Sequence, residues 1–143
     1  MNGVKLRFVE SVFVTAKIKI LIVEDEAPVA ITMSFLLTRA GCETEVATTR
    51  AEAMQMVKTG RFNLITLDVI MPGMNGFDLC REFKEDPRLR DIPVVFISGQ
   101  CSLEDQQHGL DAGAADYIVK PFDTFKFAKR LLSHVPRHEG MSY

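Results

Sequence analysis

The chain has 143 residues, of which 47% are hydrophobic and 25% charged, and its formal net charge is −2. This length and composition are typical of one globular domain that buries a core of its own, and they argue against a disordered chain or a membrane-spanning protein. A net charge of −2 gives none of the basic surface that nucleic-acid binding needs, so we expect no direct DNA binding and no membrane association.

The beginning of the chain stands apart from the pattern that follows. Lys5 and Arg7 before an apolar run resemble a weak signal peptide, but Glu10 interrupts the run and leaves it too short. We therefore expect three segments: an N-terminal extension over residues 1–16, one domain over 17–135 and a C-terminal tail over 136–143. If the sequence is the whole gene product, this tail leaves no room for a separate output domain.

In the first half of the domain, strand-like runs alternate with helical periodicity. The run 17–23 is β-branched and nearly all apolar, as expected for a parallel strand covered on both faces. A helix over 28–40 follows, with one face formed by Val29, Met33, Leu36 and Ala40. The more polar run 43–47 indicates an edge strand. A helix over 49–58 follows it, with Thr49 as its N-cap.

The second half repeats this alternation. The predicted strands are 62–67, 93–97 and 117–119. The predicted helices are 77–84, 103–112 and 124–135. A Pro- and Gly-rich loop separates the strand that ends before Asp68 from the next helix. In the last helix, the positions expected to point inward are Phe125, Ala128, Leu131, Leu132 and Val135.

Five strand–helix units in series predict an α/β fold with a doubly wound, five-stranded parallel sheet and five helices. For a single domain of this size the strand order is expected to be 2-1-3-4-5, as in flavodoxin-like proteins. In such sheets, ligands bind at the carboxyl ends of the strands.

Acidic side chains follow two strands that this order makes neighbours. Glu24 and Asp25 follow the first strand and Asp68 follows the third, and adjacent strands lie about 4.8 Å apart. Three crowded carboxylates repel each other unless a cation lies between them. Mg²⁺ suits this position because it prefers oxygen ligands and keeps water molecules for an incoming phosphate. Three solvated carboxylates at strand ends are the alternative interpretation, and we favour the metal site.

A hydroxyl and a cation complete the predicted site. Ser98 ends the fourth strand and Lys120 follows the fifth, roughly 10 Å from Asp68, a distance that an extended lysine side chain bridges for the most part. A carboxylate nucleophile, a metal, a fixed cation and a hydroxyl donor together suit the formation of an acyl phosphate.

Two motifs carry a family resemblance. The run Asp68–Gly76 (DVIMPGMNG) matches the pattern D-x-x-M-P-x-M-x-G, and Ala115–Phe122 (ADYIVKPF) ends in K-P-F. With the acidic pair and Ser98 in the same order, residues 17–135 resemble the CheY-like receiver domain of two-component response regulators.

The resemblance implies a role for each residue of the site. Asp68 would accept a phosphoryl group, Asp25 would bind Mg²⁺ directly, and Glu24 would bind it through water. The backbone carbonyl of Ile70 would be a further ligand, and Lys120 would pair with the phosphate. The resemblance also implies a cis peptide bond between Lys120 and Pro121.

The resemblance further implies a switch and its partners. Ser98 would be the switch hydroxyl and Tyr117 the switch aromatic residue, although Tyr117 could instead be an ordinary amphipathic ring at a sheet edge. The phosphoryl group would come from a histidine kinase or a histidine phosphotransfer protein. The changed surface, formed by 103–112, 117–119 and 124–135, would bind a downstream protein or a second copy of the chain. Such a protein is a signalling phosphoacceptor that itself catalyses transfer to and hydrolysis from Asp68.

Neither the cysteines nor the histidines indicate a disulfide or a zinc site. Cys42, Cys80 and Cys101 are odd in number, widely spaced and without a CxxC pattern, which favours reduced thiols in a cytoplasmic protein. His108, His134 and His138 show no ligand spacing.

The sequence bears on three alternative functions. A haloacid-dehalogenase-type phosphatase needs a second Asp where this chain has Ile70, and a flavin phosphate would be repelled by the run Glu24-Asp25-Glu26. A pseudo-receiver, an interaction module that is not phosphorylated, stays open although Asp25, Asp68 and Lys120 are all present. Ile70 and Gln100 flank the acceptor and are expected to tune dephosphorylation, in a direction that the sequence leaves open.

Overall fold

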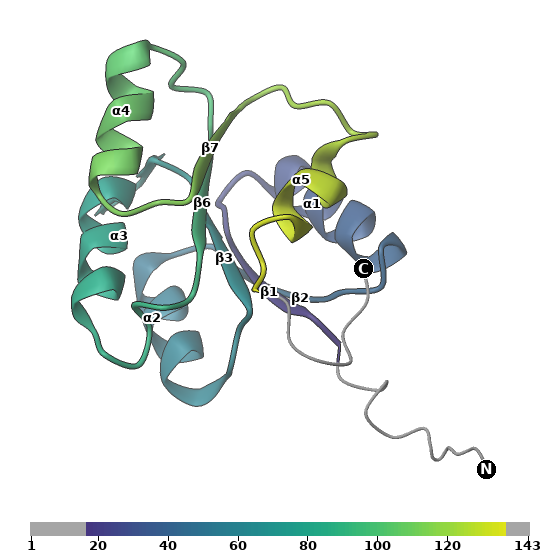
Figure 1. Ribbon diagram of the computed structural model, residues 1–143, viewed down its shortest axis with the longest axis horizontal. Coiled ribbons are helices and arrows are strands. Elements are labelled where there is room, and N and C mark those ends of the chain that lie inside the picture. The colour runs from purple at the N-terminus through teal and green to yellow at the C-terminus, as the bar shows by residue number, and fades with distance from the viewer. Residues whose placement is uncertain (1–16, 137–143) are drawn as a thin grey trace.

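The computed structural model describes residues 17–136, which form one parallel five-stranded sheet covered by helices on both faces (Figure 1). The strand order is β2-β1-β3-β6-β7. When only the five strands of this sheet are counted, this is the predicted order 2-1-3-4-5. The strands are β1 (Lys19–Val23), β2 (Glu43–Ala47), β3 (Leu64–Leu67), β6 (Val94–Ser98) and β7 (Asp116–Val119).

The helices divide between the two faces as a doubly wound sheet requires. In Figure 1, α1 (Ala27–Arg39) and α5 (Phe127–Leu132) lie on one face. The other face carries α2 (Arg50–Thr59), α3 (Gly76–Glu85) and α4 (Leu103–Asp111). The predicted N-cap is confirmed at α2, where the Thr49 hydroxyl accepts a hydrogen bond from the Glu52 N–H group at 3.1 Å.

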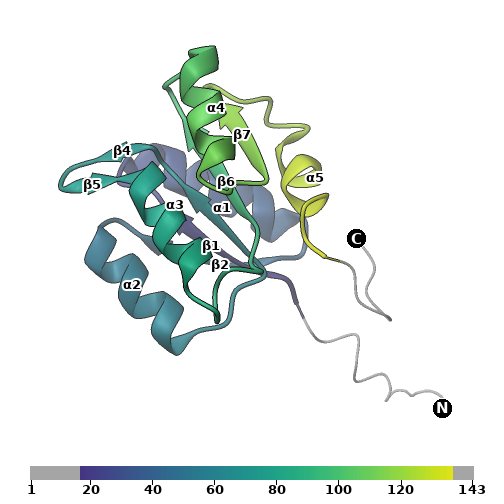
Figure 2. The same ribbon diagram turned by 60° about the vertical axis from the view of Figure 1, so that its left-hand side comes forward.

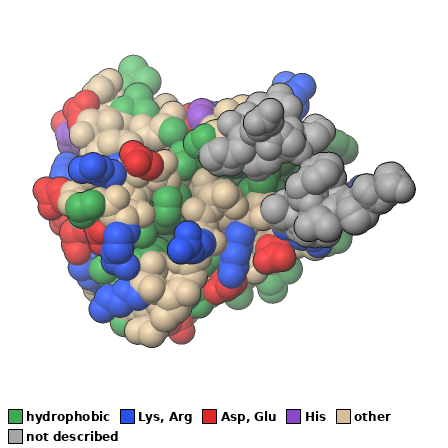
Figure 3. Space-filling view, turned by 60° about the horizontal axis from the view of Figure 1, so that its bottom comes forward, with side chains coloured by type: hydrophobic (Ala, Val, Ile, Leu, Met, Phe, Trp, Pro, Cys, Tyr) green, Lys and Arg blue, Asp and Glu red, His purple; other side chains and the backbone are tan. Residues whose placement is uncertain are grey.

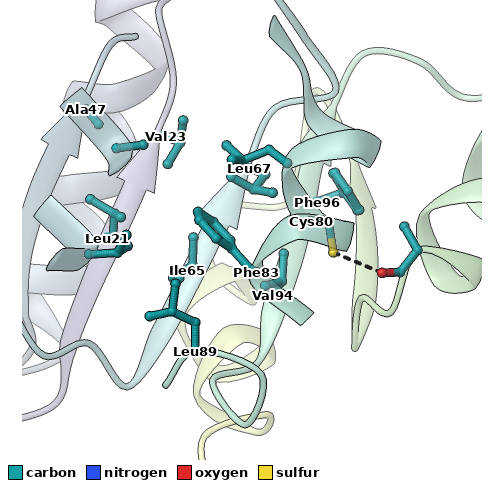
Figure 4. Close-up of a cluster of buried hydrophobic side chains, with 14 of the residues drawn as sticks. Leu21, Val23, Ala47, Ile65, Leu67, Cys80, Phe83, Leu89, Val94 and Phe96 are labelled. Atoms are coloured by element: carbon teal, nitrogen blue, oxygen red, sulfur yellow. Dashed lines mark hydrogen bonds between the residues drawn. The ribbon is translucent and has the colours of Figure 1, made fainter. Parts of the chain in front are cut away.

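Successive side chains of each strand point to opposite faces of the sheet, so each strand contributes to a hydrophobic core on both faces. In β1, Leu21 and Val23 face α2 and α3, whereas Ile20 and Ile22 face α1 and α5. Figure 4 shows the first core, in which Phe83 of α3 lies over the side chains of Ile65 and Leu67. All four β3 side chains are buried, as predicted for a strand that is covered on both faces.

The segment predicted to be a plain loop after Asp68 contains a short hairpin. The strands β4 (Ile70–Met71) and β5 (Met74–Asn75) pair in antiparallel register beside the start of α3 (Figure 2). Gly73 has a φ of 71°, a left-handed conformation that favours glycine at the turn. The prediction of a Pro- and Gly-rich turn was therefore correct, and the pairing of its flanks was missed.

The last helix begins later than predicted, and one inward position was wrong. The helix α5 starts at Phe127 rather than at residue 124, because the Asp123 carboxylate accepts hydrogen bonds from the N–H groups of Phe125 and Lys126 in a turn. Phe125 is 97% exposed, not buried. Phe127 occupies the core instead, with its ring stacked 4.3 Å from that of Phe122.

The inward face of α1 also differs from the prediction. Its buried residues are Ala30, Met33 and Leu37, and Ala40 is exposed beyond the end of the helix. Met33 is buried as predicted, and Val29 and Leu36 are partly buried and pack against the core, so the differences are the exposed Ala40 and the additional buried positions Ala30 and Leu37.

Two further expectations concern the cysteines and membrane association, and both can be compared with the structure of residues 17–136. All three cysteines are free thiols, with Cys42 and Cys80 buried and Cys101 exposed. Burial raises the pKa of the Cys80 thiol to about 11. No helix within the described range is long and apolar enough to cross a membrane. The expected extension, residues 1–16, lies outside the described residues, as does nearly all of the expected tail.

Candidate functional site

The parallel register of β1 and β3 brings the predicted carboxylates together. Val23 pairs with Leu67, so Glu24 and Asp68 leave the sheet side by side, and the Asp68 N–H group donates to the Val23 carbonyl oxygen at 3.1 Å. One carboxylate oxygen from each of Glu24, Asp25 and Asp68 lies within 4.8 Å of the others. Glu24 and Asp68 are buried and Asp25 is exposed, so the group opens to solvent on one side.

Lys120 reaches into this group from the end of β7. Its ammonium nitrogen lies 2.9 Å from Glu24 Oε1 and 3.1 Å from Asp68 Oδ2. It also lies 3.1 Å from Glu26 Oε1. The side chain therefore bridges the strand spacing that separates β7 from β3, as the sequence predicts. The peptide bond between Lys120 and Pro121 is cis, and this prediction is confirmed.

Burial and neighbouring charges shift the pKa values of both Glu24 and Lys120. Burial raises the pKa of the Glu24 carboxyl group and the nearby Asp68 charge adds to that effect, while the hydrogen bond from Lys120 works against both. Burial lowers the pKa of Lys120, but the surrounding carboxylates outweigh it and raise the pKa above its ordinary value. Lys120 thus stays positively charged throughout the physiological pH range.

The donor set of the cluster fits a hard divalent cation. Three carboxylates, those of Glu24, Glu26 and Asp68, contact the single lysine charge, and Asp25 adds a fourth carboxylate beside Glu24 and Asp68. The remaining negative charge and the grouped oxygen ligands are what Mg²⁺ requires, and one open side leaves room for its water molecules. Ile70 begins β4 two residues after Asp68, and the role of its carbonyl as a ligand stays a prediction.

Gly76 allows the start of α3 to pack closely against Asp68. A Cβ atom at this position would overlap the carbonyl oxygen of Asp68 and would lie 2.9 Å from the Cα atom of Val69. Its N–H group donates to the Val69 carbonyl oxygen at 2.6 Å. Only glycine permits this close approach, which packs the start of α3 against the backbone of Asp68.

The two proposed switch residues lie on neighbouring strands. Ser98 is 1% exposed, and its hydroxyl oxygen accepts a hydrogen bond from the Gln100 N–H group at 3.1 Å. Tyr117 is 5% exposed, with its ring centroid 5.8 Å from that of Phe96, so the ring points into the structure in this conformation. A Cβ atom at Gly109 would lie 2.8 Å from Cδ2 of Tyr117, which shows how closely α4 covers the ring.

An ion-pair network that the sequence analysis missed joins α5 to β7 beside Tyr117. Asp116 accepts two hydrogen bonds of 2.8 Å from the Arg130 guanidinium group and one of 2.9 Å from His134 Nε2. Arg130 also donates to the Tyr117 carbonyl oxygen at 3.1 Å. Burial alone would raise the pKa of Asp116, but these bonds outweigh it and lower the pKa to about 2.

The part played by Glu26 was also missed. In the sequence Glu26 serves only as an argument against a bound flavin phosphate, whereas in the structure its carboxylate binds Lys120. The only signal in the sequence was its place directly after the acidic pair.

Comparison with known proteins decides the family. The sequence model of the response regulator receiver domain matches residues 20–132, which is most of the chain. The chain belongs to the response regulator receiver family. This agrees with the fold and with the acidic cluster at the carboxyl ends of its strands.

Several relatives of this receiver domain are informative. The DNA-binding response regulator MtrA of Mycobacterium tuberculosis is 33% identical over 125 residues, which cover 87% of this chain and 54% of MtrA. The chain thus spans about half the length of the curated relatives it matches. The chemotaxis protein CheY4 of Vibrio cholerae is similar with a TM-score of 0.79 and 31% identity, over 84% of this chain and all of CheY4. The receiver domain of a signal transduction histidine kinase from Syntrophus aciditrophicus is 38% identical with a TM-score of 0.73, over 87% and 97% of the two chains.

Proposed function

We propose that this receiver domain accepts a phosphoryl group on Asp68 from a histidine kinase or a histidine phosphotransfer protein, with Mg²⁺ bound beside the acceptor. The observation that carries the proposal is the position of Asp68. Its nearly buried carboxylate lies 3.1 Å from a lysine ammonium group and within 4.8 Å of two further carboxylates.

The chemistry follows from this arrangement. An Asp68 carboxylate oxygen attacks phosphorus, the P–N bond to the donor histidine breaks, and the imidazole nitrogen keeps the electron pair. Lys120 offers N–H donors to the phosphoryl oxygens, and the Ser98 hydroxyl offers another. Bound Mg²⁺ supplies further neutralisation of the phosphoryl charge. Attack of water on phosphorus then breaks the bond between phosphorus and the Asp68 oxygen, releases inorganic phosphate and a proton, and restores the carboxylate, so the domain catalyses both steps on itself. Glu24, Asp25 and the Ile70 carbonyl are the remaining proposed ligands.

Intact-mass spectrometry tests the proposal. Acetyl phosphate with Mg²⁺ should add one phosphoryl group that is labile to base and to hydroxylamine, as expected of an acyl phosphate. Asp68→Ala should stay unlabelled. Labelling of this variant at wild-type stoichiometry, or no labelling of the wild type, contradicts the proposal. The second outcome favours the alternative of a pseudo-receiver that binds partners without being phosphorylated.

The proposed output surface is formed by α4, β7 and α5. On α4, Leu103 is 84% exposed and Leu110 is 46% exposed, which gives a downstream protein or a second copy of the domain apolar contacts. A change of association on phosphorylation would be seen by analytical ultracentrifugation with and without beryllofluoride. The free thiols and the expected kinase partner favour a cytoplasmic location.

DNA contact is not part of the proposed function of residues 17–136. The name of MtrA describes a DNA-binding protein, of which this chain matches about half. On the face seen in Figure 3, basic and acidic side chains of the described residues lie interspersed, rather than gathered into a basic area.

A further inference from the structure

The ammonium group of Lys120 contacts three carboxylates. A lysine ammonium group carries three N–H donors, and Lys120 lies within hydrogen-bond distance of three carboxylates. These belong to Glu24, Glu26 and Asp68. A phosphoryl oxygen that takes a donor from Lys120 therefore competes with these carboxylates for it.

The three contacts differ in how easily they are given up. Asp68 carries the phosphoryl group itself, and its bond to phosphorus removes the carboxylate charge, so its contact with Lys120 is weakened by the reaction itself. Glu24 is 1% exposed, and its other oxygen accepts a hydrogen bond from the Glu26 N–H group at 3.2 Å, so leaving Lys120 would strand a buried charge. The Glu26 side chain is 60% exposed and returns to water at little cost.

The surroundings leave space for that movement. Glu26 and Lys120 line one end of a cavity of about 510 Å³ between α1 and the segment after β7, with Pro28, Pro121 and Thr124 among its walls. The backbone of Glu26 is fixed at the N-cap of α1, but its side chain forms no capping hydrogen bond. The carboxylate can therefore leave Lys120 without unwinding the helix.

The geometry points to Glu26 as a positioning residue that competes with the phosphoryl group for Lys120. In the unphosphorylated domain Glu26 accepts a hydrogen bond from the ammonium group, and it stabilises that state relative to the phosphorylated one. Phosphorylation releases Glu26 from Lys120. This inference deepens the proposed function and rests on it.

The experiment measures the affinity for the phosphoryl mimic beryllofluoride at saturating Mg²⁺, followed by NMR amide shifts. Two variants separate the contact from the charge. Glu26→Ala removes both, whereas Glu26→Asp keeps the charge but is one methylene shorter and is drawn to cap α1 instead. Glu85→Ala removes an equal, exposed charge at the far end of α3, about 15 Å of helix away from the site, and serves as the control.

We expect Glu26→Ala and Glu26→Asp both to bind beryllofluoride about two- to fivefold more tightly than the wild type, the size expected for a largely exposed ion pair. Glu85→Ala should bind like the wild type. Tighter binding by Glu26→Ala alone would show a through-space charge effect and overturn the inference. It is overturned equally if neither variant, or only Glu26→Asp, binds more tightly, or if either binds more weakly. A wild type that does not bind beryllofluoride contradicts the proposed function itself, which distinguishes the two failures.

Discussion

The Tyr117 hydroxyl group donates a hydrogen bond of 2.6 Å to the carbonyl oxygen of Gln100. The N–H group of the same residue donates to the Ser98 hydroxyl oxygen at 3.1 Å. One residue of the loop between β6 and α4 thus connects both proposed switch residues. A Ser98 hydroxyl that turns toward a phosphoryl group would loosen Gln100 and, with it, the ring of Tyr117.

The first prediction concerns Ser98. Beryllofluoride with Mg²⁺ should shift the NMR amide signals of residues 98–120 well beyond those that touch the site, because Gln100 passes the movement on to Tyr117. Ser98→Ala should still accept phosphate on Asp68 but show much smaller distal shifts. Ser34→Ala, which removes a hydroxyl group from α1, is the control. Distal shifts of wild-type size in Ser98→Ala would refute a switch led by this hydroxyl group.

The second prediction concerns the contact of α4 with the ring of Tyr117. An alanine at Gly109 would place its Cβ atom 2.8 Å from Tyr117 Cδ2 and 3.0 Å from Phe96 Cδ2. Overpacking costs about 1–3 kcal/mol, and the better helix propensity of alanine returns up to about 1 kcal/mol. We expect Gly109→Ala to lower the free energy of unfolding by about 1 kcal/mol or more in urea. Gly99→Ala, which would meet nothing within 4 Å, should change it by less than about 0.5 kcal/mol. Equal free energies of unfolding for both variants would show that α4 shifts away from the Tyr117 ring without cost.

The third prediction concerns pH and the network around Asp116. Its pKa lies near 2 in the folded chain, below the ordinary 3.8, so its hydrogen bonds stabilise the fold above pH 3.8 and lose this effect as the pH falls toward 2. The depression corresponds to about 2 kcal/mol. Urea unfolding should therefore show that Asp116→Asn loses less stability than the wild type between pH 5 and pH 2. Parallel losses in both proteins would contradict the prediction.

The fourth prediction concerns the metal. Asp25 is exposed and makes one edge of the carboxylate group, so Asp25→Ala should fold normally but lose Mg²⁺ binding and phosphorylation by acetyl phosphate. EDTA should have the same effect on the wild type. Asp91→Ala, another exposed aspartate, should bind Mg²⁺ normally. If calorimetry finds wild-type affinity for Mg²⁺ in Asp25→Ala, the site has been misassigned.

The sequence was sufficient for the sheet and for the centre of the site. Parallel strands have apolar residues on both faces, and their ends meet at one edge, so the order of strands alone places Glu24, Asp25, Asp68 and Lys120 together. These positions depend on the backbone, which periodicity predicts.

The features that were missed depend on side-chain choices within the fold. Asp123 ends the helical pattern early by bonding to its own backbone, and no periodicity records that competition. The Glu26 side chain could cap α1 or form an ion pair with Lys120, and the contacts of the folded chain decide between these two interactions. The partners of Asp116 are Arg130 in α5 and His134 just after this helix, 14 and 18 residues away in sequence, and the position of α5 against β7 decides which side chains reach Asp116.

The uneven exposure of the three cysteines has a practical consequence. Cys42 and Cys80 are buried, and burial raises the pKa of both thiols, so a maleimide dye should react at Cys101 well before either of them. Cys101 directly follows Gln100 in the loop that joins Ser98 to α4. The natural chain therefore carries a single fluorescence attachment point on the segment proposed to move, and the rate of the switch could be followed in solution without introducing any substitution.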